Sequence, residues 1–414
     1  MKKVLMIAYH FPPLAGSSGI QRTLRFAQQL REFGWEPIVL TADPRAYERT
    51  SDDLLDDIPP GLVVKRAFAL DTARQLSLGG RYLGFLARPD RWMTWRYAGV
   101  ATGLSLIRQR FPHVIWSTYP IATAHLIGQA LARRSGLPWI ADFRDPMAQD
   151  GYPADLATWR SFKQIETDAV AAARFSTFTT PGAASEYRRR YPASAERIRV
   201  LENGFDEESF VGLSTESAPE PLTPGAVTLL HSGVVYPSER DPTQFFMAIA
   251  QMADAGDVRP GELVVRFRAA GHDELLRVLA QQHGIEPFIE IMPPIAYRAA
   301  LQEMLRADAL LVLQAANCNE QIPAKLYEYL RARRPIVTLT DPAGDTAGVV
   351  RAAGLDAIAR LHDVADIVAL LRRFLPSVRA GQAALPSPDY VAASSRRGRT
   401  RELVALLDAA AAGS

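Results

Sequence analysis

Short apolar runs alternate with amphipathic stretches along most of the chain, and this alternation predicts buried strands separated by helices. In the first half the apolar runs lie at residues 4–8, 37–41, 114–116, 139–141 and 177–179. Between several of these runs are helical patterns, for example at residues 20–33 and 122–134. Alternation of this kind predicts a parallel sheet with helices on both faces.

The pattern stops in the middle of the chain and then starts again. Residues 206–226 are rich in Ser, Thr, Pro and acidic side chains, which is the composition of a linker. A helix at 242–252 and further apolar runs follow, at residues 227–231, 263–269, 289–291, 310–313 and 336–339. We therefore predict an α/β protein with two Rossmann-like domains facing across a cleft, where the ligands of such sheets bind.

The predicted boundaries follow from these runs. The N-terminal Rossmann-like domain covers residues 1–205, and the linker covers 206–226. The second Rossmann-like domain covers 227–385. A helical segment at 386–414 completes the chain, and packing back on the N-terminal domain is one arrangement open to it.

Composition excludes several classes of protein. The 414 residues include 47 basic and 45 acidic side chains, a net charge of +2, so no overall field favours nucleic acid. Cys318 is the only cysteine, which excludes an internal disulfide and any cysteine-based metal site. The first apolar run is too short for a signal peptide, and no run reaches eighteen residues. We expect a cytoplasmic protein.

The most informative segment is N-E-Q-I-P-A-K-L-Y-E-Y-L at residues 319–330, between two apolar runs. Pro323 suits the first turn of a helix. Lys325 in that turn opposes the helix dipole, by roughly 0.3–1 kcal/mol, unless an anion binds there. The ammonium and the backbone N–H groups near 322–324 would then converge on a diphosphate, and Glu328 would bind ribose hydroxyls. In the alternative, Lys325 and Glu328 form an (i, i+3) pair on a solvated helix, and chemistry alone favours neither.

Two loops at strand ends are further candidates for the site. Gly16-Ser17-Ser18-Gly19 follows the first strand and suits phosphate binding or a plain turn, and it lacks the G-x-G-x-x-G spacing of an NAD site. His231-Ser232-Gly233 ends the first strand of the second domain, at the equivalent place. Arg240 follows and can neutralise phosphate, or it can pair with Glu239 or Asp241 on the surface.

Three other features of the N-terminal half carry candidate chemistry. Arg144, in Asp142-Phe143-Arg144-Asp145-Pro146, can form a structural pair with a carboxylate or line the cleft opposite an acceptor hydroxyl. His10 is the better histidine for substrate contact, because His125 lies in a helical pattern and is expected to pack. Residues 81–96 mix aromatics with arginines, which suits either a membrane surface or a packed insertion; with a membrane, the acceptor would be lipid-linked.

Glu320 and Glu328 with seven residues between them resemble the E-x7-E pattern of retaining family-four glycosyltransferases, which have the GT-B fold. Residues 325–330 and 334–337 resemble the bacterial polysaccharide-assembly branch. Other similar motifs follow in the expected order and cover almost the whole chain: Pro12-Pro13 with Gly16 to Gly19, Asp142 to Pro146, Asn203-Gly204-Phe205-Asp206, and His231-Ser232-Gly233. A metal-binding Asp-x-Asp of the other major fold is not found.

The resemblance implies a UDP- or GDP-linked sugar donor, a glycan or lipid-linked acceptor, and front-face transfer with retention and without a metal or cofactor. Glu320 would position the sugar, while Arg240 and Lys325 stabilise the leaving diphosphate. Residues 241–245, directly after Arg240, contain no lysine, a departure from the family's usual pair of cations. The nucleotide-sugar residues would be Ser232, Gly233, Arg240, Ile322, Pro323, Ala324, Lys325 and Glu328; the acceptor residues His10, Gly16, Ser17, Ser18, Gly19, Arg144 and Asp145.

Two other functions stay open at this point. A nucleotide-sugar epimerase of the same fold would turn over the donor alone, and it would need grouped acid–base side chains. A non-catalytic sugar-binding protein would bind free sugar and would give Lys325 and Arg240 no purpose. Contact with the inner face of the plasma membrane is a further expectation, and it depends on residues 81–96.

Overall fold

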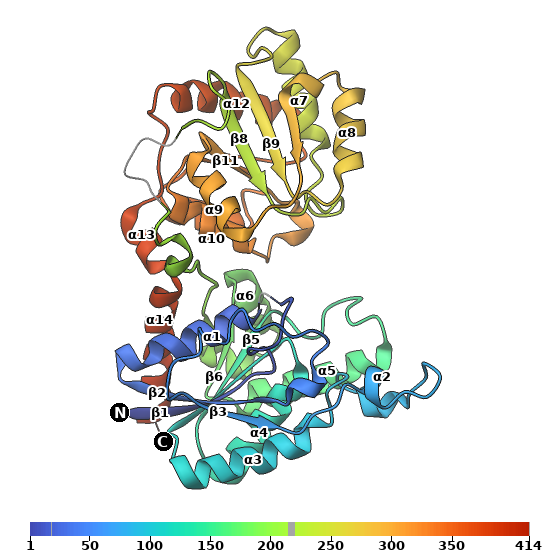
Figure 1. The fold of residues 1–414 in the computed structure, drawn as a ribbon, viewed down its shortest axis with the longest axis vertical. Coiled ribbons are helices and arrows are strands. Elements are labelled where there is room, and N and C mark those ends of the chain that lie inside the picture. Colours follow the sequence, from blue (N-terminus) through green and yellow to red (C-terminus); the bar gives the residue numbers. More distant parts are fainter. Residues whose placement is uncertain (18, 214–219, 414) are drawn as a thin grey trace. The chain divides into compact units, whose positions relative to one another are not determined.

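The computed structural model describes residues 1–17, 19–213 and 220–413, and the chain divides into two compact units (Figure 1). Unit 1 contains Met1–Asn203 and Arg396–Ser414, and unit 2 contains Gly204–Ser395. The chain therefore changes unit at 203/204 and at 395/396, while we had placed the changes within 205–226 and at 385/386.

Unit 1 is built on a parallel sheet of seven strands in the order β3-β2-β1-β4-β5-β6-β7. The strands are β1 Lys2–Ile7, β2 Trp35–Ala42, β3 Val63–Ala67, β4 Val114–Thr118, β5 Trp139–Arg144, β6 Phe175–Phe178 and β7 Ile198–Val200. The central strands are continuous apolar runs because helices cover both faces of the sheet.

The helices of unit 1 are α1 Gly19–Gln29, α2 Thr72–Gln75, α3 Trp95–Arg110, α4 Ala122–Ser135, α5 Leu156–Ala172, α6 Pro181–Arg190 and α14 Arg396–Ala412. On one face of the sheet, Val4 and Met6 of β1 pack against Leu24 of α1 and Leu403 of α14. Leu5 and its neighbours on the opposite face pack against α3 and α4 (Figure 1). The last helix therefore completes the core of the unit that holds the first strand.

Unit 2 repeats the design with six parallel strands in the order β10-β9-β8-β11-β12-β13. They are β8 Val227–Ser232, β9 Leu263–Arg268, β10 Ile289–Met292, β11 Ala309–Leu313, β12 Ile336–Leu339 and β13 Ile358–Ala359. The helices are α7 Thr243–Asp254, α8 Asp273–Gln282, α9 Tyr297–Arg306, α10 Ala324–Ala332, α11 Asp345–Ala352, α12 Val364–Arg379 and α13 Pro388–Ala393.

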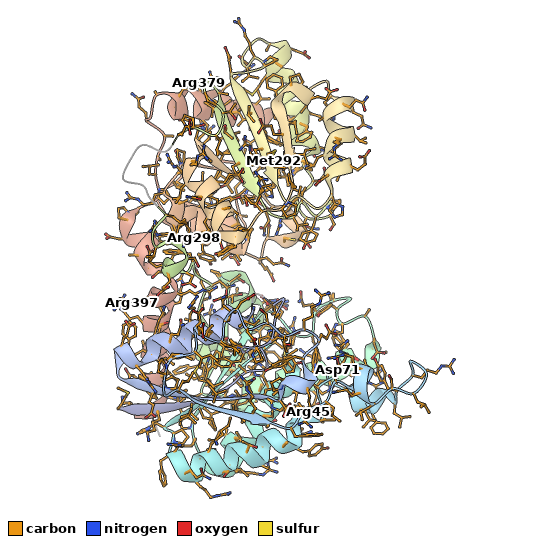
Figure 2. All side chains as sticks on the ribbon, in the orientation of Figure 1. Arg45, Asp71, Met292, Arg298, Arg379 and Arg397 are labelled. Atoms are coloured by element: carbon orange, nitrogen blue, oxygen red, sulfur yellow. The ribbon has the colours of Figure 1, made fainter. Side chains whose placement is uncertain are left out.

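The helices of unit 2 again cover both faces of the sheet, and side chains fill the space between (Figure 2). Leu229 packs with α7, α8 and α12, while Leu230 packs with α9, α10 and α11. Local signals begin several helices: the Thr180 hydroxyl accepts from Ala183 N at 3.2 Å before α6, and Asp363 accepts from Asp366 N at 3.0 Å before α12.

All ten predicted strands are present, and β3, β7 and β13 are additional. The segment predicted as a linker, 206–226, differs from a free connection. A 3₁₀ turn at Glu207–Phe210 buries Phe210, and Leu213 joins the same core cluster in unit 2. Five of the 21 residues there are acidic and eight are Ser, Thr or Pro, so composition conceals this packing. No helix among the described residues is long and apolar enough to cross a bilayer.

Candidate functional site

Each sheet has one position where the strand order reverses, and ligands of doubly wound sheets bind at the carboxyl ends of the strands at that position. In unit 1 the reversal lies between β1 and β4, and in unit 2 between β8 and β11. The loops that follow β1 and β8 carry most of the predicted acceptor loop and Arg240, respectively. The topology alone therefore points to these two edges.

The loop after β1 brings His10 and Ser17 together in unit 1. Ser17 Oγ lies 3.2 Å from His10 Nδ1 and accepts a hydrogen bond from Gly19 N at 3.2 Å. Burial, and then the charge of Arg144, lower the pKa of His10 to about 4, so the ring is neutral near pH 7. Gly16, with φ of 80°, forms the exposed turn of this loop. Ser18 lies outside the described residues.

Arg144 reaches the same point from β5. A register shift between Asp142 and Arg144, with φ of 63° at Arg144, interrupts the pairing of β5 with β6. The Arg144 guanidinium donates to Tyr119 O at 3.3 Å and reaches the start of α1. A Cβ on Gly19 would lie 2.5 Å from His10 Nδ1 and 2.8 Å from Arg144 Nη1, so glycine is required there. Among the described residues, no carboxylate forms an ion pair with Arg144.

Asp142 shows that part of the Asp142–Pro146 motif serves the fold. Arg22 donates two bonds to the Asp142 carboxylate, each of 2.9 Å, and the hydroxyls of Thr118 and Thr177 donate at 2.8 and 2.7 Å. Burial opposes ionisation, but the Arg22 charge and these bonds hold the pKa of Asp142 below its usual value. Asp145, by contrast, is exposed, and the Thr179 hydroxyl donates to its carboxylate at 3.4 Å.

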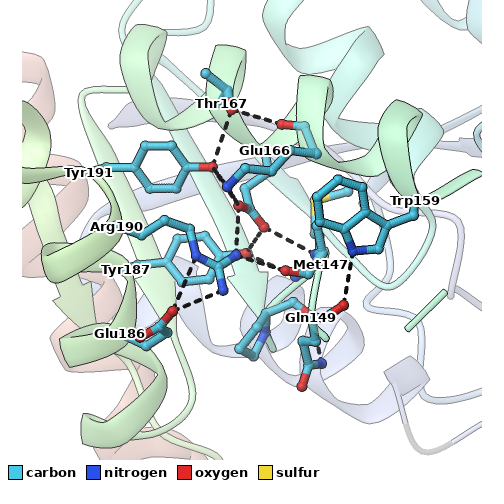
Figure 3. A network of polar contacts seen from close by, with 12 residues as sticks. Met147, Gln149, Trp159, Glu166, Thr167, Glu186, Tyr187, Arg190 and Tyr191 are labelled. Atoms are coloured by element: carbon cyan, nitrogen blue, oxygen red, sulfur yellow. Dashed lines mark hydrogen bonds and ion pairs between the residues drawn. The ribbon is translucent and has the colours of Figure 1, made fainter. Parts of the chain in front are cut away.

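A buried network around Glu166 of α5 holds the loop that follows Arg144 and Asp145 (Figure 3). The carboxylate accepts from Ala148 N at 3.1 Å and from the hydroxyl of Tyr191 at 2.5 Å, and it also accepts from the Tyr187 hydroxyl. Lys163 and Arg190 donate at 3.0 and 2.8 Å.

Tyr187 and Arg190 of this network also bind two further backbone groups of the loop. Met147 N donates to the Tyr187 hydroxyl at 2.9 Å, and Arg190 donates to Ala148 O at 2.8 Å. Burial would raise the pKa of Glu166, but the hydrogen bonds from the two tyrosines, Arg190 and Lys163 outweigh it and lower that pKa. Sequence patterns gave no sign of this network.

In unit 2, a pocket of about 190 Å³ lies between the loop after β8 and the start of α10. It is lined by Glu239, Arg240, Gln314, Cys318, Gln321, Ile322, Pro323 and Ala324. Four of the predicted nucleotide-sugar residues thus meet here: Arg240, Ile322, Pro323 and Ala324. The pocket is smaller than the roughly 300–1,000 Å³ of sites for whole drug-sized ligands, so it suits a group such as a diphosphate.

Arg240 is held by backbone and ring contacts. Its guanidinium donates to Val234 O at 2.6 Å and lies 5.3 Å from the centre of the Tyr236 ring. Within the part of the chain that the structure describes, it forms no ion pair; Asp241 instead accepts from Thr243 N at 2.9 Å before α7. The positive charge of Arg240 therefore stays available at the pocket.

The start of α10 differs in two ways from expectation. The helix begins at Ala324, with Pro323 before its first residue, and proline has no N–H to offer an anion. Lys325 pairs with Glu328 at 2.8 Å, the contact of the alternative interpretation. Tyr297 of α9 also donates to Glu328 at 2.8 Å, and its ring centre lies 5.5 Å from Lys325 Nζ. Neither Lys325 nor Glu328 lines the pocket.

The end of β8 is fixed from α10. Ser232 N donates to the Tyr329 hydroxyl at 2.8 Å, and Gly233 adopts φ of 139°, which favours glycine. A Cβ on Gly233 would lie 4.0 Å from Lys325 Cγ, so these two predicted residues are neighbours. His231 lies 3.0 Å from Leu311 O through Nδ1. Burial, followed by the charges of Arg240 and Lys325, lowers the pKa of His231 to about 4.

Glu320 lies exposed in the loop before α10, outside the pocket lining. Gln314, which our sequence prediction missed, shapes that loop: its amide donates to Cys318 O at 2.7 Å and to Gln321 O at 2.9 Å. A polar residue directly after the apolar run of β11 was an available signal for it. Tyr297 had no such signal, because only packing brings α9 to α10. In the described ranges, no group of three or more His, Cys, Asp or Glu could hold a metal.

Solved structures share the fold of this chain at low sequence identity. Sucrose-phosphate synthase from Thermosynechococcus elongatus is 13% identical with a TM-score of 0.62, and each chain is covered completely. Anabaena HepE, solved with UDP and glucose, is 13% identical with a TM-score of 0.63 over 99% of this chain and 100% of its own. The trehalose-6-phosphate synthase of Burkholderia multivorans is 13% identical with a TM-score of 0.61 and complete coverage of both chains.

These likenesses establish the predicted fold class, GT-B. Residues 18–204 match the glycosyl transferase 4-like domain family. No curated protein sequence matches the chain. With that domain in unit 1 and the GT-B fold over both units, the protein is a glycosyltransferase, as the sequence motifs had implied.

Proposed function

We propose that the protein transfers a sugar from a UDP- or GDP-linked donor to a glycan or lipid-linked acceptor, with retention of the anomeric configuration. The proposed setting is cell-surface polysaccharide assembly at the inner face of the plasma membrane. The observation that carries the proposal is the pocket of about 190 Å³ in unit 2, where Arg240 faces the loop before α10. HepE structures contain UDP or UDP-glucose, which supports a nucleotide donor here.

The chemistry follows from where charge develops. As the glycosidic bond breaks, its electron pair passes to the leaving diphosphate, and cations placed there stabilise the transition state more than the ground state. Arg240 would supply this charge together with Lys325 and the N–H groups of Ile322 and Ala324. No metal is needed in this proposal. Glu320 would position the sugar, Glu328 and the end of β8 at Ser232 and Gly233 would bind the nucleotide, and the leaving phosphate oxygen would take the acceptor proton.

Unit 1 would bind the acceptor. His10, Arg144 and the start of α1 at Gly19 converge, and Gly16, Ser17 and Asp145 lie in the adjoining loops. A neutral His10 can donate a hydrogen bond to an acceptor hydroxyl or accept one from it. The Arg144 guanidinium, which pairs with no carboxylate in the part of the chain that the structure describes, suits polar or anionic groups. The Glu166 network would keep Arg144 and Asp145 in place during turnover.

A thermal-shift panel of UDP, GDP, ADP, CMP, NAD and free sugars tests the donor class. A ligand at a hundred times its Kd should stabilise the protein by about 2.7 kcal/mol. We expect a response to one nucleoside diphosphate. Glu320→Ala should abolish transfer while keeping that response, and the product's anomeric proton should report retention by NMR. A response to free sugar alone would favour a binding protein, and turnover of donor without acceptor would favour an epimerase.

A further inference from the structure

A short hairpin of unit 1 and the residues next to it display exposed large apolar side chains. Leu78 N donates to Arg81 O at 2.8 Å, and Arg81 N donates to Leu78 O at 3.1 Å. The turn between them is Gly79-Gly80, with φ of 57° and 77°. Two consecutive positive φ values are typical of a type I′ hairpin turn, which glycine accommodates without strain. The hairpin therefore has a defined conformation.

The exposed side chains form a run, which we call the apolar finger, residues 76–85. Five large apolar residues in these ten positions are exposed: Leu76, Leu78, Tyr82, Leu83 and Phe85. Leu78 is 90% exposed, Leu83 62% and Phe85 64%. Single exposed apolar residues are ordinary on a soluble protein, but a group of this size marks an interaction surface.

Hydrogen bonds fix the base of the apolar finger to unit 1, so its exposed side chains belong to an anchored segment. The Thr72 hydroxyl donates to Leu86 O at 2.7 Å, and Thr72 N donates to Arg91 O at 2.9 Å. Asp71, labelled in Figure 2, is fully buried and accepts from Arg91 at 2.8 Å. The finger emerges next to α2 in Figure 1.

The charge of this segment has one sign. From 72 to 89 the sequence contains three arginines, Arg74, Arg81 and Arg88, and no lysine or acidic residue. Arg74 and Arg81 are exposed. Arg88 lies near Asp155, whose pKa is lowered first by hydrogen bonds from Thr158 and also by the Arg88 charge. Arginines beside exposed leucine and phenylalanine suit an anionic headgroup layer, where the charges meet phosphate and the apolar groups enter the acyl boundary.

We propose that the apolar finger docks unit 1 on an anionic lipid surface, with Leu78, Leu83 and Phe85 inserted and Arg74 and Arg81 on lipid phosphates. The finger follows β3, so it begins at the carboxyl ends of the parallel strands, the end of the sheet at which His10 and Arg144 also lie. Docking would bring the acceptor residues of unit 1 to the membrane surface, a consequence that rests on the proposed function. The lipid contact itself does not rest on it.

Co-sedimentation of the full chain with vesicles tests the proposal, using phosphatidylcholine with and without phosphatidylglycerol. We expect binding to the anionic vesicles only, weakened by salt. Leu78→Ser/Leu83→Ser/Phe85→Ser should weaken binding at least about tenfold, the size expected for losing large inserted side chains. Arg74→Gln/Arg81→Gln should remove the preference for anionic lipid. Val211→Ser/Leu385→Ser, which changes exposed apolar residues of unit 2, is the matched control and should bind normally.

A second measurement places the finger in the lipid directly. Leu83→Trp should be quenched by brominated acyl chains, and Val211→Trp should not. Absence of vesicle binding by the unchanged protein, or equal binding by the triple variant, would overturn the proposal. So would a dimer that the triple variant dissociates without any lipid binding, because the finger would then contact a second copy. Nucleotide thermal shifts, measured without vesicles, report the donor site separately, so failure of either proposal is distinguishable.

Discussion

Two glutamates, one in each unit, use the same carboxylate group in different ways. Glu166 of unit 1 is fully buried and accepts from five donors, which fills the capacity of its two oxygens. Glu328 of unit 2 accepts from Lys325 and Tyr297, and its side chain is 17% exposed. Since a carboxylate offers about four acceptor positions, Glu328 can still receive a ligand's hydroxyl. The two carboxylates therefore differ more in whether all their acceptor positions are occupied than in how deeply they are buried.

The arginines repeat the contrast within each unit. Arg22 and Arg268 each make two bonds to one buried carboxylate, those of Asp142 and Glu303. Arg144 and Arg240 have no carboxylate partner among the described residues and contact backbone carbonyls instead. Each unit thus combines an arginine committed to the fold with one whose charge is available. The two available arginines lie in the loops where the strand order reverses or next to them, where ligand binding is expected.

Substitution of the two glutamates should produce the largest difference between the units. Glu166→Gln removes the charge that Lys163 and Arg190 share and should lower the free energy of unfolding by about 3 kcal/mol or more, as breaking a buried ion pair does. Glu328→Gln breaks a partly exposed pair and should cost less than about 1 kcal/mol. Urea denaturation of both variants measures this. Equal losses would remove the distinction between a saturated and an unsaturated carboxylate.

Acid should destabilise both units through histidines whose pKa is lowered: His10 and His125 in unit 1, and His231 in unit 2. Burial lowers the pKa of His125 and of His231 to about 4, although Asp142 partly offsets the shift at His125. The native state therefore binds fewer protons than the unfolded state, whose histidines titrate near 6.5. The contribution is complete above about pH 6.5 and is lost as pH falls towards 4, by up to about 3 kcal/mol per histidine.

Unfolding measured across that pH range tests the direction of the pH dependence of stability and its assignment to these histidines. His125→Gln and His231→Gln should each flatten the decline in stability between pH 6.5 and 4, and the slope is compared, so a lower absolute stability of a variant does not obscure the result. An unchanged slope in either variant would show that the buried histidine is not the group responsible.

The fold was predictable from sequence wherever burial is complete. Parallel strands covered on both faces are continuous apolar runs, so β1, β5, β8 and β12 were evident. The strands that were missed lie at the sheet edges or close to them. β3 and β7 include Lys65, Arg66 and Arg199 in partly exposed positions, and β13 has only two residues. Half-exposed edge strands lose the apolar pattern on which such prediction depends.

The candidate site was predictable only where its residues are close in the chain. The segment from Glu320 to Glu328 is local, so it could be proposed as a motif, and Ile322, Pro323 and Ala324 from it line the pocket. The Glu166 network joins α5, α6 and the loop after β5, and Tyr297 reaches Glu328 from another helix. Such contacts form only when the chain is folded, and a single sequence carries no periodic signal for them.

The smallest expected effect tests the comparison of the two cations at the proposed donor site of unit 2. Arg240→Gln should weaken nucleoside diphosphate binding about tenfold, or about 1.4 kcal/mol, because no carboxylate among the described residues pairs with its charge. Lys325→Gln should weaken it only about threefold, since Glu328 already neutralises part of that charge. Isothermal titration calorimetry measures both, with Arg277→Gln, an exposed arginine paired with Glu274, as the control. If Lys325→Gln weakens binding as much as Arg240→Gln does, the ion pair with Glu328 does not reduce the contribution of Lys325 to nucleotide affinity. The diphosphate must then displace the Glu328 carboxylate when it binds.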